Sequence, residues 1–168
     1  MTADCETTFK QWLNEHLGLI LRVVRAYGCN TEDRDDLFQE ICLQIWLSIP
    51  RFAEQAKVST WIYRVALNTA LVWNRGEKRR RRHSRQFVDF VRPQSECSGQ
   101  PDEIIESLYN AIHKLPKVDA SVVLMHLDGL AYSEMSEILG ISESNVGVKL
   151  NRAKKQLAQL LEGFIDDI

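Results

Sequence analysis

Apolar side chains recur along the first part of the chain at the spacing of an amphipathic helix. Steps of three and four residues place them on one face of a helix that we expect at about residues 6–27. The residues on this face are Phe9, Leu13, Leu17, Ile20, Val24 and Tyr27. A short break follows, and Thr31 or Asp33 can cap a second helix. We expect that helix to stop at Ile49, because the residue before Pro50 resists helical backbone angles.

A third helix is predicted to start at Ser59 or Thr60, after a loop at about residues 51–59. One of its faces is most simply interpreted as core, and consists of Ile62, Val65, Ala66, Thr69, Val72 and Trp73. Steps of three, four and seven residues align a second stripe, formed by Trp61, Arg64, Asn68 and Arg75. The helix then runs into a cluster of cations, Lys78, Arg79, Arg80, Arg81 and Arg82. Such a cluster can attract phosphates without regard to sequence, although a solvated basic tail is the simpler alternative.

The helical pattern lapses over residues 86–102, which contain two prolines, a glycine and many polar side chains. This composition is typical of a flexible linker, which reaches about 55 Å when extended. Helical periodicity then resumes, with breaks at Pro116 and at the turn Asp128-Gly129. No strand-like alternation is sustained anywhere in the sequence. The sequence therefore predicts an all-α protein with two small helical domains, at residues 1–85 and 103–168, joined by the linker.

The most specific pattern lies in the second domain. Ser136 is a small residue where two helices can cross, Gly140 follows four residues later, and Val146 comes six residues beyond that. Gly140 can adopt the positive φ that ends a helix, and Ser142 can cap the next helix. This layout predicts a helix-turn-helix, whose second helix presents its early residues to the major groove of DNA. A two-helix hairpin with a solvated basic face is the alternative.

The second helix of this unit carries side chains suited to DNA. The candidates for contacts with base edges are Ser144, Asn145 and Lys149. Amide and ammonium groups can donate hydrogen bonds to adenine or guanine, so the pattern does not assign the base that each would contact. The later cations are expected to contact phosphates, and they are Arg152, Lys154 and Lys155.

Charge is distributed unevenly over the 168 residues, although the formal net charge is only -2. Residues 1–50 hold four basic and eight acidic side chains, residues 51–100 hold eleven and four, and residues 101–168 hold six and eleven. A basic middle thus lies between two acidic ends. The near-neutral total weakens indiscriminate binding to polyanions, while a local basic patch keeps its attraction for nucleic acid.

Other classes of function find little support in the sequence. The four cysteines and four histidines are scattered, without the spacing of metal ligands, and we find no nucleophile or carboxylate pair that indicates an enzyme. We therefore expect neither a cofactor nor a catalytic residue. No apolar run approaches the roughly 20 residues of a membrane span, and the first residues lack the pattern of a signal peptide. A cytoplasmic protein without membrane insertion is expected.

Three motifs in order give the chain a resemblance to a known family. The first is the acidic helix Asp36–Trp46, which begins Asp-Leu-Phe-Gln-Glu, and the second is Thr60–Asn68. The third combines Leu115-Pro116 with Leu130–Gly140 and Val146–Ala153. Over roughly residues 8–162 the chain resembles sigma factors of the extracytoplasmic-function (ECF) group, the smallest members of the sigma-70 family.

The resemblance implies a promoter-specificity subunit of bacterial RNA polymerase. Its first domain, at residues 1–85, would bind the polymerase core through Asp36, Gln39 and Glu40. The same domain would recognise and melt the minus-10 promoter element, with Lys57, Trp61, Arg64, Asn68 and Arg75 as candidates. Trp61 is equally well interpreted as a core residue. The second domain, at residues 103–168, would read the minus-35 element. The implied partners are core polymerase, promoter DNA and an anti-sigma protein.

Some residues depart from the family pattern, and other functions stay open. Gly147 stands where many relatives carry a lysine, Ala131 where a capping Ser or Thr is usual, and Ser136 where alanine is more usual. The main alternative function is a stand-alone helix-turn-helix regulator with an N-terminal sensing or dimerisation domain. An RNA-binding helical protein that uses the basic run is a third possibility.

Overall fold

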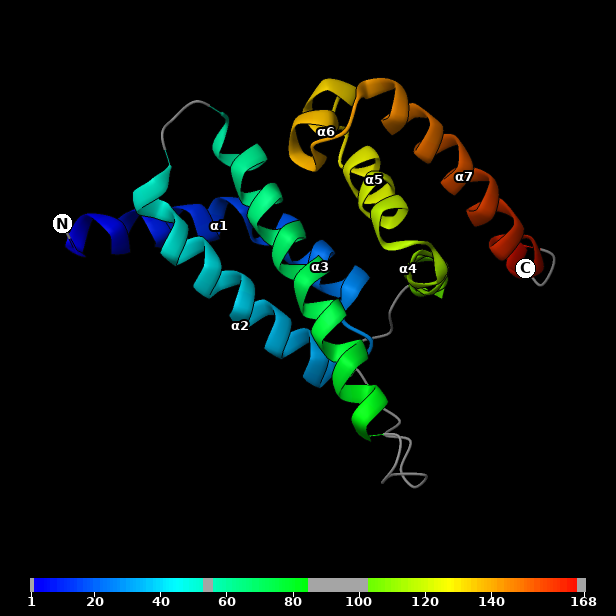
Figure 1. Cartoon of the computed structure of the whole chain (residues 1–168), viewed down its shortest axis with the longest axis horizontal. Coiled ribbons are helices and arrows are strands. Elements are labelled where there is room, and N and C mark those ends of the chain that lie inside the picture. The colour runs from blue at the N-terminus through cyan, green and yellow to red at the C-terminus, as the bar shows by residue number, and fades with distance from the viewer. Residues whose placement is uncertain (1, 53–55, 85–102, 166–168) are drawn as a thin grey trace.

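The computed structural model describes residues 2–52, 56–84 and 103–165, with side chains for 5–52, 56–76 and 103–162. In these ranges every regular element is a helix, which confirms the all-α prediction. Two groups of helices lie against each other in Figure 1, α1 to α3 on one side and α4 to α7 on the other. None of the helices in the described ranges combines the length and apolar character needed to cross a bilayer.

The first group consists of α1 (Thr2–Tyr27), α2 (Thr31–Ser48) and α3 (Val58–Ser84), which all contact one another. A single 3-10 turn, η1 (Ile49–Arg51), follows α2. The cap of α2 is Asn30, whose side chain accepts a 2.7 Å hydrogen bond from the Asp33 N–H. The prediction of Thr31 or Asp33 as the cap was therefore wrong, although the break before this helix was correctly located.

The second group consists of α4 (Glu103–Lys114), α5 (Lys117–Leu127), α6 (Tyr132–Leu139) and α7 (Glu143–Ile165). The long helix α7 packs against α4, α5 and α6. Asp102, a residue type that can cap α4, falls outside the described residues. Gly129 has a φ of 78°, which agrees with the turn predicted at Asp128-Gly129, between α5 and α6.

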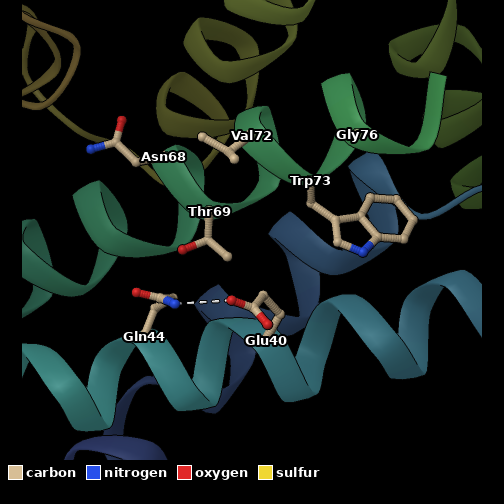
Figure 2. Close-up of a pocket in the computed structure, with 7 residues that line it drawn as sticks. All are labelled: Glu40, Gln44, Asn68, Thr69, Val72, Trp73 and Gly76. Atoms are coloured by element: carbon tan, nitrogen blue, oxygen red, sulfur yellow. Dashed lines mark hydrogen bonds between the residues drawn. The ribbon is translucent and has the colours of Figure 1, made fainter. Parts of the chain in front are cut away.

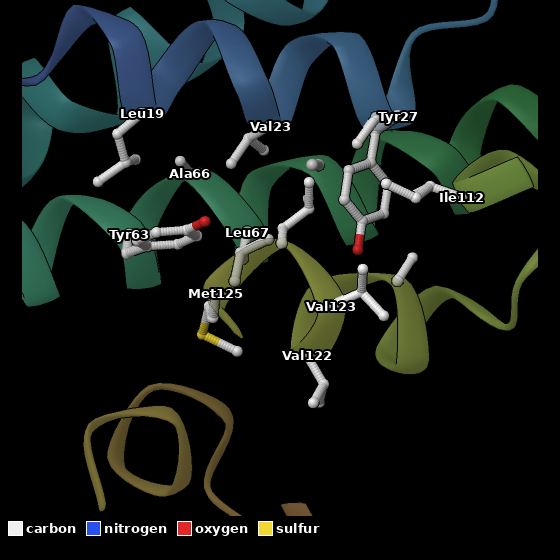
Figure 3. Close-up of a cluster of buried hydrophobic side chains, with 14 of the residues drawn as sticks. Leu19, Val23, Tyr27, Tyr63, Ala66, Leu67, Ile112, Val122, Val123 and Met125 are labelled. Atoms are coloured by element: carbon white, nitrogen blue, oxygen red, sulfur yellow. The ribbon is translucent and has the colours of Figure 1, made fainter. Parts of the chain in front are cut away.

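The two groups share one buried core rather than having a separate core each. Figure 3 shows side chains from α1, α3, α4 and α5 pointing toward one another, among them Tyr27, Tyr63 and Met125. Tyr27 and Met125 are completely buried, and Tyr63 is 1% exposed. A continuous apolar cluster joins the N-terminal and C-terminal helices, an arrangement that helical periodicity alone does not predict.

Polar groups at the same boundary are paired across it. The Tyr27 hydroxyl lies 2.8 Å from the Lys117 carbonyl oxygen, to which it donates, and 2.6 Å from Ser121 Oγ. Tyr63 donates a 2.7 Å hydrogen bond to Asp128 Oδ2, and Arg22 Nε lies 2.6 Å from the other oxygen of that carboxylate. Buried polar groups are stable only when they have partners. These pairs therefore fix the position of one group of helices on the other.

Candidate nucleic-acid interface

The helix-turn-helix has the geometry predicted from its residues. Gly140 ends α6 with a φ of 68°, and its N–H donates to the Ser136 carbonyl at 2.9 Å. Ser136 Oγ donates to the Ile141 carbonyl at 2.6 Å, which ties the turn to the first helix. Ser142 Oγ accepts a 3.3 Å hydrogen bond from the Asn145 N–H at the start of α7. Val146 is completely buried, so α7 is held against the rest of the domain along one side.

Ala131 leaves the start of α6 without a capping side-chain oxygen. Half of a capping box is nevertheless present, because the Glu134 carboxylate accepts a 3.0 Å hydrogen bond from the Ala131 N–H. This hydrogen bond, together with the nearby Lys57 ammonium, lowers the pKa of Glu134 below its ordinary value. A charged Glu134 in the first turn also suits the positive end of the helix dipole.

The predicted recognition residues of α7 differ in their surroundings. Ser144 and Asn145 are exposed on its first turns, and Lys154 and Lys155 are exposed further along. Lys149 and Arg152 lie between these pairs. Both form ion pairs with the carboxylate of Asp119, which is completely buried at the start of α5. Asp119 did not stand out in the sequence, since a lone acid in a first helical turn is common.

A groove between α2 and α3 brings together two sets of residues that had been assigned to different partners. Its volume is about 510 Å³, and its lining includes Glu40 and Gln44 from α2 and Asn68 and Trp73 from α3. Figure 2 shows the Gln44 amide donating a hydrogen bond to the Glu40 carboxylate, near Thr69. Gln44 Nε2 and Glu40 Oε1 are 2.9 Å apart. Glu40, a candidate for polymerase binding, thus lies across the groove from Asn68, a candidate for DNA binding.

The two faces predicted for α3 are confirmed only in part, because the buried face also contains Tyr63, Leu67 and Ala70. Ile62 and Ala66 are completely buried, whereas Asn68 and Arg75 are exposed. Val72 was placed on the core face but is 66% exposed. The reason is geometric: Val72 lies four residues after Asn68, one helical turn along the same side. It therefore extends the exposed stripe over the groove of Figure 2.

Trp61 lies in a cluster of aromatic rings at the start of α3. Its ring centroid is 5.6 Å from that of Phe52, which in turn packs edge-on against Trp12 at 5.0 Å. Its indole N–H donates to Ser48 Oγ at 3.3 Å. The side chain is partly buried, so these contacts provide Trp61 with a packing role whether or not it also meets DNA.

Two predicted DNA-binding cations contact the helix-turn-helix itself. Arg64 Nη2 donates to the main-chain carbonyl of Glu137 at 2.7 Å and lies 3.4 Å from the Glu137 carboxylate. Lys57 Nζ lies 3.1 Å from the carboxylate of Glu134. Both acids belong to α6. In this arrangement both cations are paired with the second domain, but the Lys57 side chain remains 76% exposed whereas that of Arg64 is 33% exposed.

The described residues do not cover every predicted site. The helix α3 continues to Ser84, so the backbone of the basic run Lys78–Arg82 is helical. The side chains of that run and the proposed linker at 86–102 lie outside the described part of the chain.

One exposed apolar surface was not anticipated. Leu43 is 49% exposed and Leu47 is 54% exposed, both on α2, and Trp46 between them is 37% exposed. These residues follow Asp36, Gln39 and Glu40 along the helix. Contiguous exposed apolar residues commonly mark a protein-binding surface. The signal in the sequence was that apolar residues surround this part of α2 on more sides than a single buried face requires.

Taken together, the helix-turn-helix and the polar stripe of α3 define a two-part helical DNA-binding protein. Residues 12–80 match the family Sigma-70 region 2, and residues 105–157 match Sigma-70, region 4. The chain belongs to the sigma-70 family of RNA polymerase sigma factors, in the ECF group. It is a promoter-specificity subunit of RNA polymerase.

Individual relatives cover most of the chain. It is 31% identical over 132 residues to the RNA polymerase sigma factor SigZ of Bacillus subtilis, an alignment that covers 77% of this chain and 73% of that protein. It is 28% identical over 159 residues to the ECF RNA polymerase sigma factor SigM of Mycobacterium tuberculosis, covering 94% of this chain and 79% of the other.

Solved structures have the same fold. The sigma factor RpoE of Bartonella quintana, in complex with the anti-sigma factor NepR, superposes with a TM-score of 0.73 at 20% identity, covering 92% of this chain and 97% of that one. CnrH, in complex with the cytosolic domain of CnrY, superposes with a TM-score of 0.67 at 19% identity, covering 94% and 90%.

Proposed function

We propose that the two helical domains divide promoter recognition between them. Residues 1–85 bind core polymerase and the minus-10 element, residues 103–168 bind the minus-35 element, and residues 86–102 link the two. The main support is the orientation of α7, which buries Val146 and Leu150 while Ser144 and Asn145 in its first turn remain exposed. A helix held in this way can enter the major groove with its N-terminal end.

The minus-35 element is read by the first turns of α7. Ser144 and Asn145 are exposed and carry short polar groups that can reach base edges. The four cations further along the helix, Lys149, Arg152, Lys154 and Lys155, provide the positive charge that favours phosphates. Two of them, Lys149 and Arg152, also form ion pairs with Asp119, which partly neutralise their charge.

The minus-10 element is opened by α3 and the loop before it. Asn68 and Arg75 are exposed along one side of α3, with Lys57, Trp61 and Arg64 near its start. A base that leaves the stack costs a few kcal/mol, which a fitted site and phosphate contacts can offset. The basic run Lys78, Arg79, Arg80, Arg81 and Arg82 contacts the DNA backbone beyond this site.

Core polymerase binds the exposed side of α2. Asp36 and Gln39 are exposed there, and Glu40 is partly exposed, so the surface is acidic and suits a basic partner. Leu43 and Leu47 extend it with apolar area. A charged rim beside exposed apolar residues is a common composition of a protein interface.

DNA binding through Arg64 requires α6 to move away, because the Glu137 carbonyl and carboxylate hold this cation, while Lys57 forms an exposed ion pair with Glu134. We therefore propose that core polymerase binds the form in which the two domains have separated. An anti-sigma protein that holds the domains together is the corresponding inhibitor. The sigma factor RpoE of Bartonella quintana, which was solved in complex with the anti-sigma factor NepR, supports the expectation of such a partner. The protein acts in the cytoplasm and has no catalytic residue of its own.

The test is reconstitution with core polymerase. Purified protein and core should start transcription on a subset of genomic fragments, and footprinting should locate the two promoter elements. The variant Asp36→Ala/Gln39→Ala/Glu40→Ala should lose core binding while its helicity by circular dichroism is unchanged. Failure of the wild-type protein to bind core at micromolar concentration would contradict the proposed function.

A matched control is available on α1. Glu6, Gln11 and Glu15 are also two acids and one amide, and all three are exposed. The variant Glu6→Ala/Gln11→Ala/Glu15→Ala makes the same change in charge and composition. It should bind core as the wild-type protein does. Equal loss of binding in both triple variants would show that total charge, rather than the surface of α2, determines the affinity.

A further inference from the structure

Asp119 is a completely buried acid in the first turn of α5. Burial of an isolated carboxylate is costly unless cations and hydrogen bonds compensate it. The compensating groups come from α7, the helix to which we assign minus-35 recognition. Asp119 therefore connects the interior of the second domain directly to its proposed DNA-binding face.

Two cations of α7, three residues apart, converge on this carboxylate. Arg152 donates to Oδ2 twice, from Nε at 2.9 Å and from Nη2 at 2.6 Å. Lys149 Nζ lies 3.5 Å from Oδ1, and that oxygen accepts no hydrogen bond. The Arg152 side chain is 54% exposed, whereas that of Lys149 is only 23% exposed. Arg152 is thus held in one orientation while part of it still reaches the surface.

The neighbouring polar side chains of α7 are more exposed than that of Lys149. Ser144 and Asn145 on one side, and Lys154 and Lys155 on the other, have exposed side chains. An arginine fixed by two hydrogen bonds loses less rotational freedom when it binds DNA. A lysine drawn toward a buried carboxylate is less available to phosphates. The cluster therefore limits how many mobile cations α7 brings to the duplex.

We propose that Asp119 is a positioning residue for minus-35 recognition. It orients Arg152 and keeps Lys149 at the protein, so that the bases are selected by Ser144 and Asn145 rather than by general attraction to phosphates. This inference rests on the proposed function for its DNA target. Without the Asp119 charge, Lys149 and Arg152 would bind phosphates freely, and α7 would bind DNA more tightly but with less selectivity.

The first test uses the full-length chain and an unrelated DNA duplex, between 50 and 200 mM salt. Each additional phosphate contact steepens the slope of log affinity against log salt by about 0.9. Asp119→Asn keeps the shape of the side chain and should steepen the slope by about one to two such contacts. Glu103→Gln makes the same change in net charge at an exposed position on α4 and should leave the slope unchanged. The double variant Asp119→Asn/Lys149→Met should lose part of the increase.

A second pair of variants does not depend on replacing a buried residue. Lys149→Met should lower the salt slope by much less than one contact, because Asp119 draws that cation away from the DNA. Lys155→Met removes an exposed cation from the same helix and should lower the slope by about one contact. An equal decrease in both variants would overturn the proposal, even if Asp119→Asn fails to fold.

The second test measures selectivity in complex with core polymerase. The ratio of affinities for a footprinted promoter fragment and for unrelated DNA should fall by about fivefold or more in Asp119→Asn, comparable to the loss of one base-pair contact. If Asp119 only stabilises the fold, the variant will unfold at a lower temperature with this ratio and the salt slope unchanged. If wild-type protein with core does not prefer any promoter, the proposed function fails, while the salt slopes still decide whether Asp119 restrains the two cations.

Discussion

Arg64 of α3 donates a 2.7 Å hydrogen bond to the main-chain carbonyl of Glu137, in the last turn of α6. Carbonyls at the end of a helix lack partners within the helix, and this end is the negative pole of the helix dipole. An arginine is therefore a favourable cap for it. The N–H group that makes this contact cannot bind DNA at the same time, so the position of α6 relative to α3 controls how available Arg64 is to promoter DNA.

Weakening the boundary between the domains should favour their separation. The variant Asp128→Asn removes the charge that pairs with Arg22 and weakens the acceptor of the Tyr63 hydroxyl. A hydrogen bond to a charged group contributes about 1.5–3 kcal/mol. We expect a larger radius of gyration by small-angle X-ray scattering and tighter binding of core polymerase, because less free energy is needed to open the protein.

The control for this change is Glu143→Gln, which removes one negative charge from an exposed position on α7. It should leave both the radius of gyration and the affinity for core unchanged. If Asp128→Asn has the same radius of gyration as the wild-type protein, the ion pair with Arg22 does not hold the domains together.

Replacing Trp61 separates its packing role from a role on DNA. Trp61→Phe keeps an aromatic ring beside Phe52 but loses the hydrogen bond to Ser48 Oγ, at a cost of about 1 kcal/mol in the free energy of unfolding. Trp61→Ala should cost about 3 kcal/mol. Both are measured by urea unfolding. If Trp61 is structural, Trp61→Phe will open promoter DNA normally by permanganate footprinting. Normal stability with defective opening would instead place the indole on the DNA.

The buried Tyr27 predicts loss of stability at high pH. Burial raises the pKa of Tyr27 from 10.0 to about 12, so the folded protein holds this proton where the unfolded chain releases it. The stabilisation is complete below pH 10 and is lost as the pH rises from 10 to about 12. Its maximum is about 2–3 kcal/mol. Burial also raises the pKa of Tyr63, which acts in the same direction.

Urea unfolding of wild-type protein and of Tyr27→Phe, between pH 9 and pH 11.5, measures this contribution. All other titratable side chains are the same in the two proteins, so the comparison isolates the phenol. The variant should be less stable at pH 9, because it loses the hydrogen bond to the Lys117 carbonyl. The difference between the two proteins should shrink as the pH rises, and a constant difference would exclude a linked proton at Tyr27.

Two glycines of the helix-turn-helix should respond to alanine in opposite directions. Gly140 has a φ of 68°, where a side chain costs about 1–2 kcal/mol, so Gly140→Ala should lower the melting temperature. Gly147 lies inside α7, and a Cβ there would be 3.4 Å from Tyr132 Cε2. Gly147→Ala should therefore stabilise the helix by up to about 1 kcal/mol. Differential scanning calorimetry measures both effects, and a melting temperature that falls in Gly147→Ala would mean that Tyr132 cannot adjust.

The sequence by itself predicted the helices and the helix-turn-helix. Both depend on interactions within a few residues, such as the spacing of apolar side chains, the positive φ of Gly140, and the cap at Ser142. Such local interactions repeat along the chain at the period of the helix, so they can be recognised without knowing what lies opposite. Val72 was misassigned to the core face because apolar residues occur on more than one side of this helix, although it lies one turn after the exposed Asn68 and therefore on the same side.

Tertiary structure alone decided which distant residues meet. Asp119 and Arg152 are 33 positions apart, Tyr63 and Asp128 are 65 apart, and Arg64 and Glu137 are 73 apart. No periodicity connects such pairs, because their contact depends on how one helix packs on another. For the same reason the sequence indicated the charged side chains suited to DNA, while only the fold determined that Asp119 pairs with Lys149 and Arg152 and that acids of α6 pair with Lys57 and Arg64.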